Sequence, residues 1–166
     1  MGQNIYGDFQ SAYLHKIAAH RLKSALLNLQ KHYPGYGFLI FDALRPLSAQ
    51  KKLWDWVKGT PQQDYIADPS KRSLHNFGMA VDLTVFNSAG VELDMGTAFD
   101  SFQELAQPQL EERFLHEGLL TKNQISNRLI LRHAMQEAGF LQLPHEWWHY
   151  NALPAEEIRA KFNLIL

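Results

Sequence analysis

The chain has 166 residues, which fits a single domain over residues 1–166, and 46% of them are hydrophobic while 20% are charged, as in globular rather than disordered proteins. Its 16 basic and 17 acidic side chains give a net charge of −1, which argues against a broad nucleic-acid surface. The absence of cysteine excludes disulfides, thiolate metal sites and cysteine nucleophiles, so a metal site would have to combine some of the eight histidines with carboxylates.

The amino-terminal residues 1–9 show no basic segment followed by an apolar one, as a signal peptide would. No apolar run in the chain approaches the roughly 18 residues that a membrane helix needs. We therefore expect a cytoplasmic protein without a membrane partner.

The first half of the chain alternates helical and extended patterns. Apolar residues at helical spacing predict a helix over residues 11–33, with its lysines and arginine facing solvent. A β-type run follows at 38–41. Ser48 is the expected N-cap of a helix that ends at Val57, and the polar residues 60–73 predict a loop.

The second half repeats this mixture. Residues 79–86 are typical of a strand, and a Thr-x-x-Gln capping box opens a helix that runs from Thr121 to Glu137. The aromatic residues 140–150 favour extended structure, and residues 154–162 a final short helix. Without a regular βαβ rhythm, these elements predict an α+β fold, with a small, largely antiparallel sheet flanked by helices.

Two short segments contain the side chains best suited to chemistry. Asp82 stands in an apolar strand, where an unpaired carboxylate is costly, so it needs a strong partner such as a metal ion. His75 precedes that strand and His149 follows on a later one; two histidines and one aspartate give zinc three ligands and leave its fourth position open for water. Glu146, three residues before His149, could take a proton from that water. The pattern predicts one Zn²⁺ per chain.

Residues 145–149 also match His-Glu-x-x-His, which indicates a zinc site only on a helix. Here the motif lies between Pro144 and Pro154 and contains two tryptophans, which favour extended structure and which we expect to form core and pocket wall. On a strand its two histidines would be about 13 Å apart. We therefore expect that His145 is not a ligand.

Four segments resemble the VanX-type D-alanyl-D-alanine dipeptidases. They are an aromatic-Asp-x-x-Arg-Pro segment at 41–46, Ser-x-His-x-x-Gly-x-Ala-x-Asp at 73–82, Met-Gly-x-x-Phe-Asp at 95–100 and Glu-Trp-Trp-His at 146–149. All four occur in the order of that family, whose zinc enzymes form a wider group with VanY-type D,D-carboxypeptidases and the hedgehog signalling domain. The resemblance implies the fold of that group.

The resemblance also implies roles for individual residues. His75, Asp82 and His149 match the zinc ligands, and Glu146 matches the base that later returns the proton to the departing amine. Arg45 matches the arginine that stabilises the oxyanion, which suits a fixed guanidinium.

Further residues match the substrate subsites less directly. Asp100 matches a carboxylate that faces the free ammonium of the substrate, and Ser73 a hydroxyl near its carboxylate, although a turn or cap role would also explain Ser73. Asp94 is expected to be structural, and Gly78 to allow a close backbone approach beside the metal loop. Asn76 departs from the family, which usually has serine there. The remaining histidines are expected to be solvent-exposed or capping residues: His15, His20, His32, His116 and His133.

The primary hypothesis is a zinc dipeptidase whose partner is a small peptide, D-Ala-D-Ala or a related dipeptide from the cell wall. A second is a D,D- or L,D-carboxypeptidase or endopeptidase of the same group. A third is a zinc-bearing interaction domain without catalysis, against which the presence of both Glu146 and Arg45 argues. Oligomeric state is not predicted.

Overall fold

The computed structural model describes residues 6, 11–60, 63 and 68–166, and shows the expected α+β fold. The predictions for residues 1–9 and for the loop at 60–73 therefore lie partly outside the described residues. The helices and strands are, in chain order, α1 (Lys16–His32), β1 (Gly37–Asp42), α2 (Leu47–Val57), β2 (Ala80–Phe86), α3 (Glu111–His116), α4 (Lys122–Glu137), β3 (Leu141–Gln142), β4 (His149–Asn151) and α5 (Ala155–Lys161).

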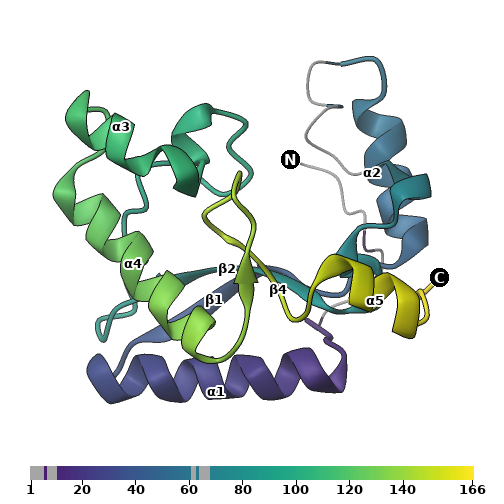
Figure 1. The fold of residues 1–166 in the computed structure, drawn as a ribbon, viewed down its shortest axis with the longest axis horizontal. Helices are drawn as coiled ribbons and strands as arrows, with labels where there is room; N and C mark the ends of the chain where they lie inside the picture. Colours follow the sequence, from purple (N-terminus) through teal and green to yellow (C-terminus); the bar gives the residue numbers. More distant parts are fainter. Residues whose placement is uncertain (1–5, 7–10, 61–62, 64–67) are drawn as a thin grey trace.

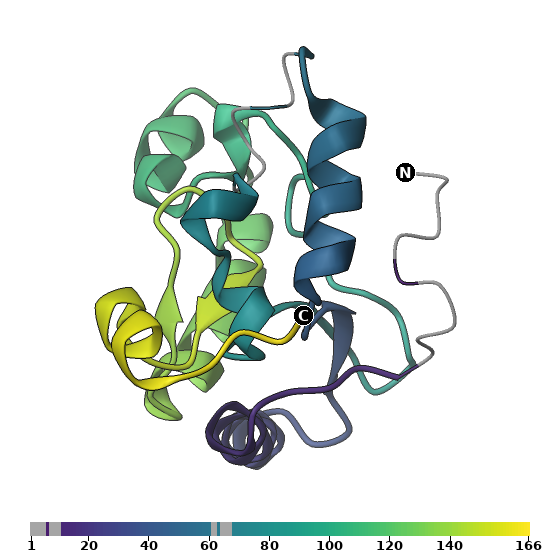
Figure 2. The ribbon, with the colours of Figure 1, turned by 90° about the vertical axis from the view of Figure 1, so that its right-hand side faces the viewer.

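The four strands form one antiparallel sheet in the order β1-β2-β4-β3. Helix α1 runs beneath the sheet and packs against α4, while α2 and α3 stand to either side above it (Figures 1 and 2). Strand β2 lies in the middle and is buried on both faces, except at its last residue, which explains its almost continuous apolar sequence. None of the helices in the described part of the chain combines the length and apolar character that a membrane crossing requires.

The register of the sheet aligns three polar residues. Asp82 of β2 is paired with Asp42 of β1 on one side and with His149 of β4 on the other. The β1–β2 ladder shifts between Ile40 and Asp42; such a bulge re-aims the side chains beside it. The polar groups thus meet in one row across the sheet.

The first helix begins at Lys16, so the predicted start at residue 11 is wrong. His15 occupies the N-cap position, and its Nδ1 accepts a hydrogen bond from the backbone of Ile17 at 3.3 Å. The backbone N–H of His15 donates to the carbonyl of Gly78 at 2.8 Å. This contact with a distant segment holds His15 outside the helix, which the local helical pattern could not indicate.

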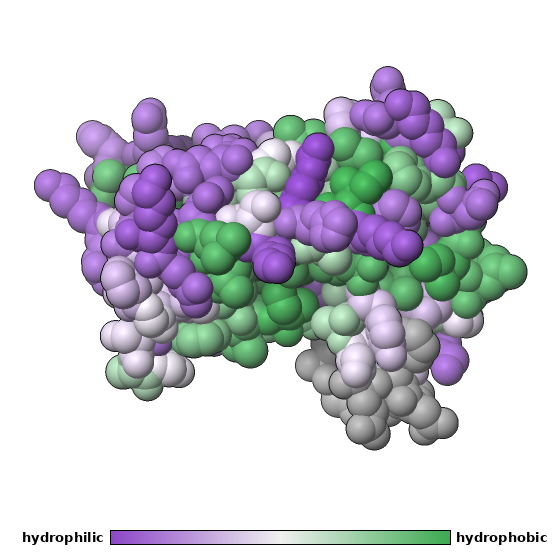
Figure 3. Space-filling model, turned by 90° about the horizontal axis from the view of Figure 1, so that it is seen from below, coloured by the Kyte–Doolittle hydropathy of each residue, from purple (hydrophilic) through white to green (hydrophobic). Residues whose placement is uncertain are grey.

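Polar side chains lie between apolar patches on the face that α1 covers (Figure 3). The lysines Lys16, Lys23 and Lys31 are exposed, as expected. The same prediction is wrong for Arg21, whose guanidinium donates to the carbonyls of Gly139, at 2.6 Å, and Ala152. Arg21 thus ties α1 to the two ends of the segment that contains β3 and β4.

Two helix starts test the capping predictions. The capping box is confirmed, because the backbone of Thr121 donates to Gln124 Oε1 at 2.8 Å and the backbone of Gln124 donates to Thr121 Oγ1 at 3.2 Å. Ser48, by contrast, is not an N-cap. Helix α2 begins at Leu47, with Pro46 at the cap position, and the N–H of Leu47 is satisfied by the carbonyl of Ile165 from the other end of the chain, at 2.9 Å.

One further prediction needs correction, and one helix was not predicted. Residues 140–150 are not continuously extended, because β3 and β4 occupy only the ends and residues 144–145 and 147–148 form turns between them. Helix α3 was not expected at all. Its buried Glu111 bonds to Arg128 and Arg132 of α4, a tertiary contact that no local pattern indicates.

Gly78→Ala is expected to lower the free energy of unfolding by about 2–3 kcal/mol. Gly78 has φ 63°, and an added Cβ would lie 2.9 Å from the backbone nitrogen of His15, so the close approach predicted there is confirmed. Gly118→Ala is the matched control, because Gly118 has φ 72° but open space around the added Cβ, so the expected loss is about 1 kcal/mol. Urea unfolding of both variants measures the difference; equal losses would contradict the close approach.

Candidate active site

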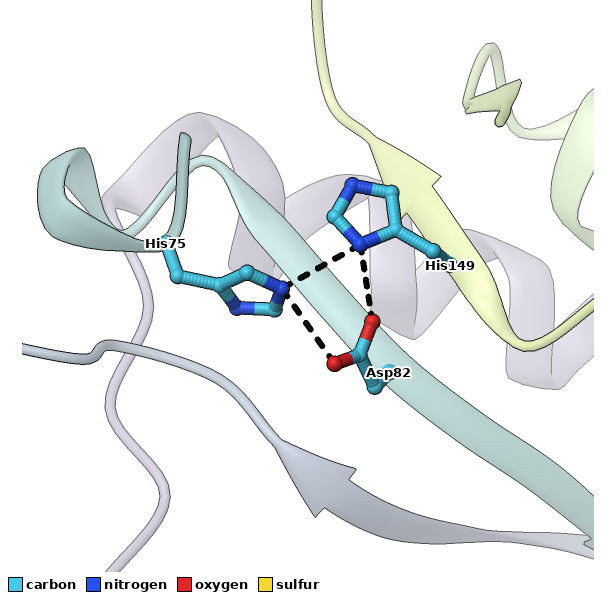
Figure 4. A group of neighbouring side chains, drawn as sticks. All are labelled: His75, Asp82 and His149. Carbon is cyan, nitrogen blue, oxygen red and sulfur yellow. Dashed lines mark hydrogen bonds and ion pairs between the residues drawn. The ribbon is translucent and has the colours of Figure 1, made fainter. Parts of the chain in front are cut away.

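Three side chains from different elements point toward one another around Asp82, in the row of polar residues that crosses the sheet (Figure 4). His75 comes from a short 3₁₀ turn (Leu74–Phe77), Asp82 from β2 and His149 from β4. The Nε2 of His75 lies 3.3 Å from Asp82 Oδ2, and the Nδ1 of His149 lies 2.9 Å from Asp82 Oδ1. The two imidazole nitrogens are 3.2 Å apart. One ligand atom from each residue therefore fits within a sphere of metal-site size, all within 4.8 Å of one another.

Each imidazole is oriented by a hydrogen bond from its other nitrogen. His75 Nδ1 donates to the carbonyl of Ala43 at 2.7 Å, and His149 Nε2 donates to Asn151 Oδ1 at 2.8 Å. These bonds leave His75 Nε2 and His149 Nδ1 directed at Asp82. An outer hydrogen bond of this kind is the usual companion of a metal-binding histidine.

The carboxylate of Asp82 is buried, and its Oδ1 accepts no hydrogen bond of good geometry among the described residues, although His149 Nδ1 lies at ion-pair distance, 2.9 Å away. Burial would raise the pKa of Asp82, but the neighbouring His75 and His149 outweigh it and hold that pKa well below its usual range. For His149, burial lowers the pKa, and the charge of Asp82 outweighs it and raises the pKa to about 9. The cluster favours a cation, and a buried carboxylate beside two imidazoles fits a metal ion.

Glu146 lies in the turn between β3 and β4, beside the cluster. Its Oε2 is 3.7 Å from His149 Nδ1. Burial raises the pKa of Glu146, although His149 acts in the opposite direction. Gln142 stabilises this turn, because its Nε2 donates hydrogen bonds to the carbonyl of Trp147 at 3.0 Å and to the hydroxyl of Tyr150 at 2.9 Å. Glu146 is therefore a carboxylate held next to the ligand cluster.

Arg45 is fixed by a set of polar contacts at the end of β1. Its Nε donates to Asp42 Oδ2 at 2.8 Å, its NH2 group bonds to the same oxygen, and its NH1 group donates to Gln50 at 3.0 Å. Burial lowers the pKa of Arg45, but Asp42 outweighs it and raises that pKa above its usual value. The buried amide of Asn76 donates to the backbone carbonyl of Arg45 at 2.8 Å, and the hydroxyl of Tyr6 donates to Asp42. The guanidinium is therefore charged and held by several hydrogen bonds where it lines the cleft.

Asp100 is placed by an aromatic stack. The preceding Phe99 stacks on Phe41 with ring centroids 4.5 Å apart and meets Trp148 edge-on at 5.6 Å. Asp100 itself has φ 57°, a left-handed conformation uncommon outside glycine, which the packed neighbour sustains. Burial, together with the negative charge of Asp82, raises the pKa of Asp100 to about 6, so the carboxylate is ionised at neutral pH.

Ser73 precedes the turn that carries His75. It occupies the N-cap position of that turn, but its side chain makes no capping hydrogen bond, so the cap role considered from the sequence is not observed. Its position brings it to the same cleft as the other candidates. The seven residues singled out from the sequence line one cleft of about 290 Å³: Arg45, Ser73, His75, Asp82, Asp100, Glu146 and His149.

The His-Glu-x-x-His reading is wrong. Residues 145–149 are not helical, and the metal-type group contains His149 but not His145. His145 is exposed, and its Nδ1 faces Gln109 at 3.2 Å. The tryptophans are buried as expected, and Trp148 lines the cleft.

The structural reading of Asp94 is confirmed, because its carboxylate accepts from the backbone of Gly96 and from Gln124, each at 2.9 Å. His15 is a capping residue, and the other four histidines of that group are exposed. Both results agree with the expectations.

Several supporting residues were missed. Local signals could have indicated Asp42 and Asn151 as supporting residues. Asp42 lies three residues before Arg45. Asn151 lies two residues after His149 on the same strand, and such residues share one face. Arg128 carried no such signal. It is fully buried on α4 and donates to the carbonyls of Met95, at 2.8 Å, and Leu105, at 2.9 Å, bracketing the segment that contains Asp100.

A two-histidine, one-carboxylate cluster with an adjoining glutamate and arginine defines a candidate metallohydrolase site. The chain belongs to the D-Ala-D-Ala dipeptidase family of M15 peptidases, whose family model matches residues 2–163.

Three curated D-alanyl-D-alanine dipeptidases are similar to the chain. The Escherichia coli K12 protein is 34% identical over 137 residues, covering 82% of this chain and 65% of the relative. The Synechocystis protein is 27% identical over 161 residues, covering 79% and 65%. The Enterococcus faecium protein is 29% identical over 153 residues, covering 81% and 72%. The chain thus spans just under two thirds of the length of the first two relatives.

Proposed function

We propose that the protein is a zinc-dependent dipeptidase that hydrolyses D-Ala-D-Ala or a related dipeptide derived from the cell wall. One observation carries the proposal: the buried Asp82–His75–His149 cluster shares a single cleft with Glu146 and Arg45. Membership of the dipeptidase family supports the same substrate class.

The proposed metal ligands are His75 Nε2, His149 Nδ1 and a carboxylate oxygen of Asp82. These are the atoms that the outer hydrogen bonds leave directed at one another. When bound, zinc supplies a Lewis acid that polarises a carbonyl oxygen and makes water more acidic.

Two residues of the chain then act on the reaction: one transfers the proton, and the other stabilises the developing negative charge. Glu146 takes a proton from the attacking water and delivers it to the departing amine, a role that suits a carboxylate held beside the ligands. Arg45 donates hydrogen bonds to the oxygen that becomes negative. Because Asp42 and Gln50 already fix its guanidinium, that stabilisation needs little reorganisation.

The proposed substrate is a zwitterion, and the cleft offers a charge for one of its ends. Asp100, ionised at neutral pH, faces the substrate ammonium, while the hydroxyl of Ser73, which makes no capping hydrogen bond, lies nearer the substrate carboxylate. A cleft of about 290 Å³ is near the lower end of ligand pockets, which run from roughly 300 to 1,000 Å³, and suits a dipeptide better than a long peptide.

The zinc-loaded protein is expected to release D-alanine from D-Ala-D-Ala, and chelation to lower that rate by at least about 100-fold until zinc is restored. An amine-release assay on the dipeptide and on a pentapeptide ending in D-Ala-D-Ala measures both activity and length preference. Faster cleavage of the pentapeptide would support the carboxypeptidase alternative. Zinc binding without any cleavage would support the interaction domain.

A further inference from the structure

Two arginines line the cleft, and they differ in their partners. Arg45 is held by Asp42 and Gln50 beside the metal-type cluster. Arg159 reaches the cleft from α5 and forms no ion pair within the described ranges. Its helix neighbour Glu157 is already paired with Lys161 at 2.8 Å. Arg159 therefore offers the cleft a cation without a carboxylate partner of its own.

The position of Arg159 is set by the segment before the metal-bearing turn. Its NH2 group lies 3.5 Å from the backbone carbonyl of Arg72, at the edge of hydrogen-bonding distance. Arg72 has φ 56°, which is uncommon for a residue with a side chain. Ser73 comes next and lines the same cleft, and its hydroxyl makes no capping bond. A guanidinium and a hydroxyl donor therefore come from adjoining segments.

The opposite charge comes from a different part of the fold. Asp100 belongs to the segment that leads into α3, and α3 and α5 lie on opposite sides of the β3–β4 hairpin (Figure 1). Among the charged groups that act most on Asp100 are Asp82, Arg45 and Asp42, but not Arg159. The cleft thus presents a carboxylate and a cation from separate elements, and the metal-type cluster is formed by the 3₁₀ turn together with β2 and β4.

We propose that Arg159, together with Ser73, binds the C-terminal carboxylate of the dipeptide and makes the enzyme selective for peptides with a free carboxylate. The inference rests on the proposed dipeptidase function. Guanidinium and hydroxyl donors complement a carboxylate, and arginine can bind both of its oxygens. Because Arg159 is exposed at the cleft, its contribution falls on substrate binding more than on the chemical step.

The test compares D-Ala-D-Ala with the same dipeptide amidated at its C-terminus. Arg159→Gln is expected to raise KM for the free acid by about fivefold to tenfold, with kcat changed less than about twofold, because an exposed charged contact contributes modestly. For the amide, the same variant is expected to leave KM within about twofold of the wild type. Arg159→Lys should restore part of the affinity for the free acid, because lysine keeps the positive charge but lacks the planar guanidinium that can bind both carboxylate oxygens. Lys161→Gln, which removes a positive charge from the same helix, should match the wild type.

An unchanged KM for the free acid in Arg159→Gln would overturn the inference, and so would equal losses for acid and amide. A wild type that cleaves neither substrate counts against the dipeptidase function instead. In that case calorimetric binding of the two compounds to the zinc-loaded protein decides the inference. The inference is supported if Arg159→Gln loses affinity for the free acid but not for the amide. It is overturned if the wild type binds both compounds equally, or binds neither.

Discussion

Glu146→Gln is expected to lower kcat for D-Ala-D-Ala by about 10²- to 10⁴-fold, the usual contribution of a general base. Glutamine keeps the shape of the side chain but cannot accept a proton from water. Since Glu146 is not among the three residues of the metal-type cluster, the variant should still bind one zinc ion per chain. Steady-state kinetics with a zinc determination on the same sample measures both quantities.

The matched control is Glu112→Gln, a neutralised glutamate on the exposed side of α3. It should leave kcat, KM and zinc content within about twofold of the wild type. If Glu146→Gln retained more than about a tenth of the wild-type kcat, Glu146 would be excluded as the base.

His149→Ala is expected to abolish zinc binding and peptide cleavage together. The substitution removes one of two imidazoles in the cluster and leaves Asp82 buried with fewer neighbours. Zinc should therefore raise the melting temperature of the wild type, by linkage of binding to folding, and leave that of the variant unchanged. Thermal unfolding with and without zinc measures this, and circular dichroism at 20 °C checks that the variant is folded.

His145→Ala separates this site from the His-Glu-x-x-His alternative. His145 is exposed and faces Gln109 rather than the cluster, so its removal should preserve zinc binding and activity. Loss of zinc in His145→Ala, with retention in His149→Ala, would mean that the geometry of the cluster does not describe the metal site.

Local chemistry was readable from the sequence because it acts over a few residues. The Thr121–Gln124 capping box closes within one helical turn, and β2 was recognisable because a central strand is apolar on both faces. The cost of burying Asp82 without a partner predicted that it needs one. That argument and the four family segments singled out seven of the residues that line the cleft. The prolines around residues 145–149 correctly opposed a helix there.

What only the tertiary structure decided involves groups far apart in the chain. The start of α1 depends on Gly78, the start of α2 on Ile165, and the hydrogen bonds of Arg21 on Gly139 and Ala152. No pattern within α5 places Arg159 at the cleft beside Ser73. A sequence window reports hydrogen bonds and periodicity within a few residues, whereas these contacts satisfy polar groups that meet only after the sheet has formed. The sequence by itself therefore determined most of the elements and the chemical type of the site. Their packing decided where helices begin, added α3 and set which charges surround the substrate.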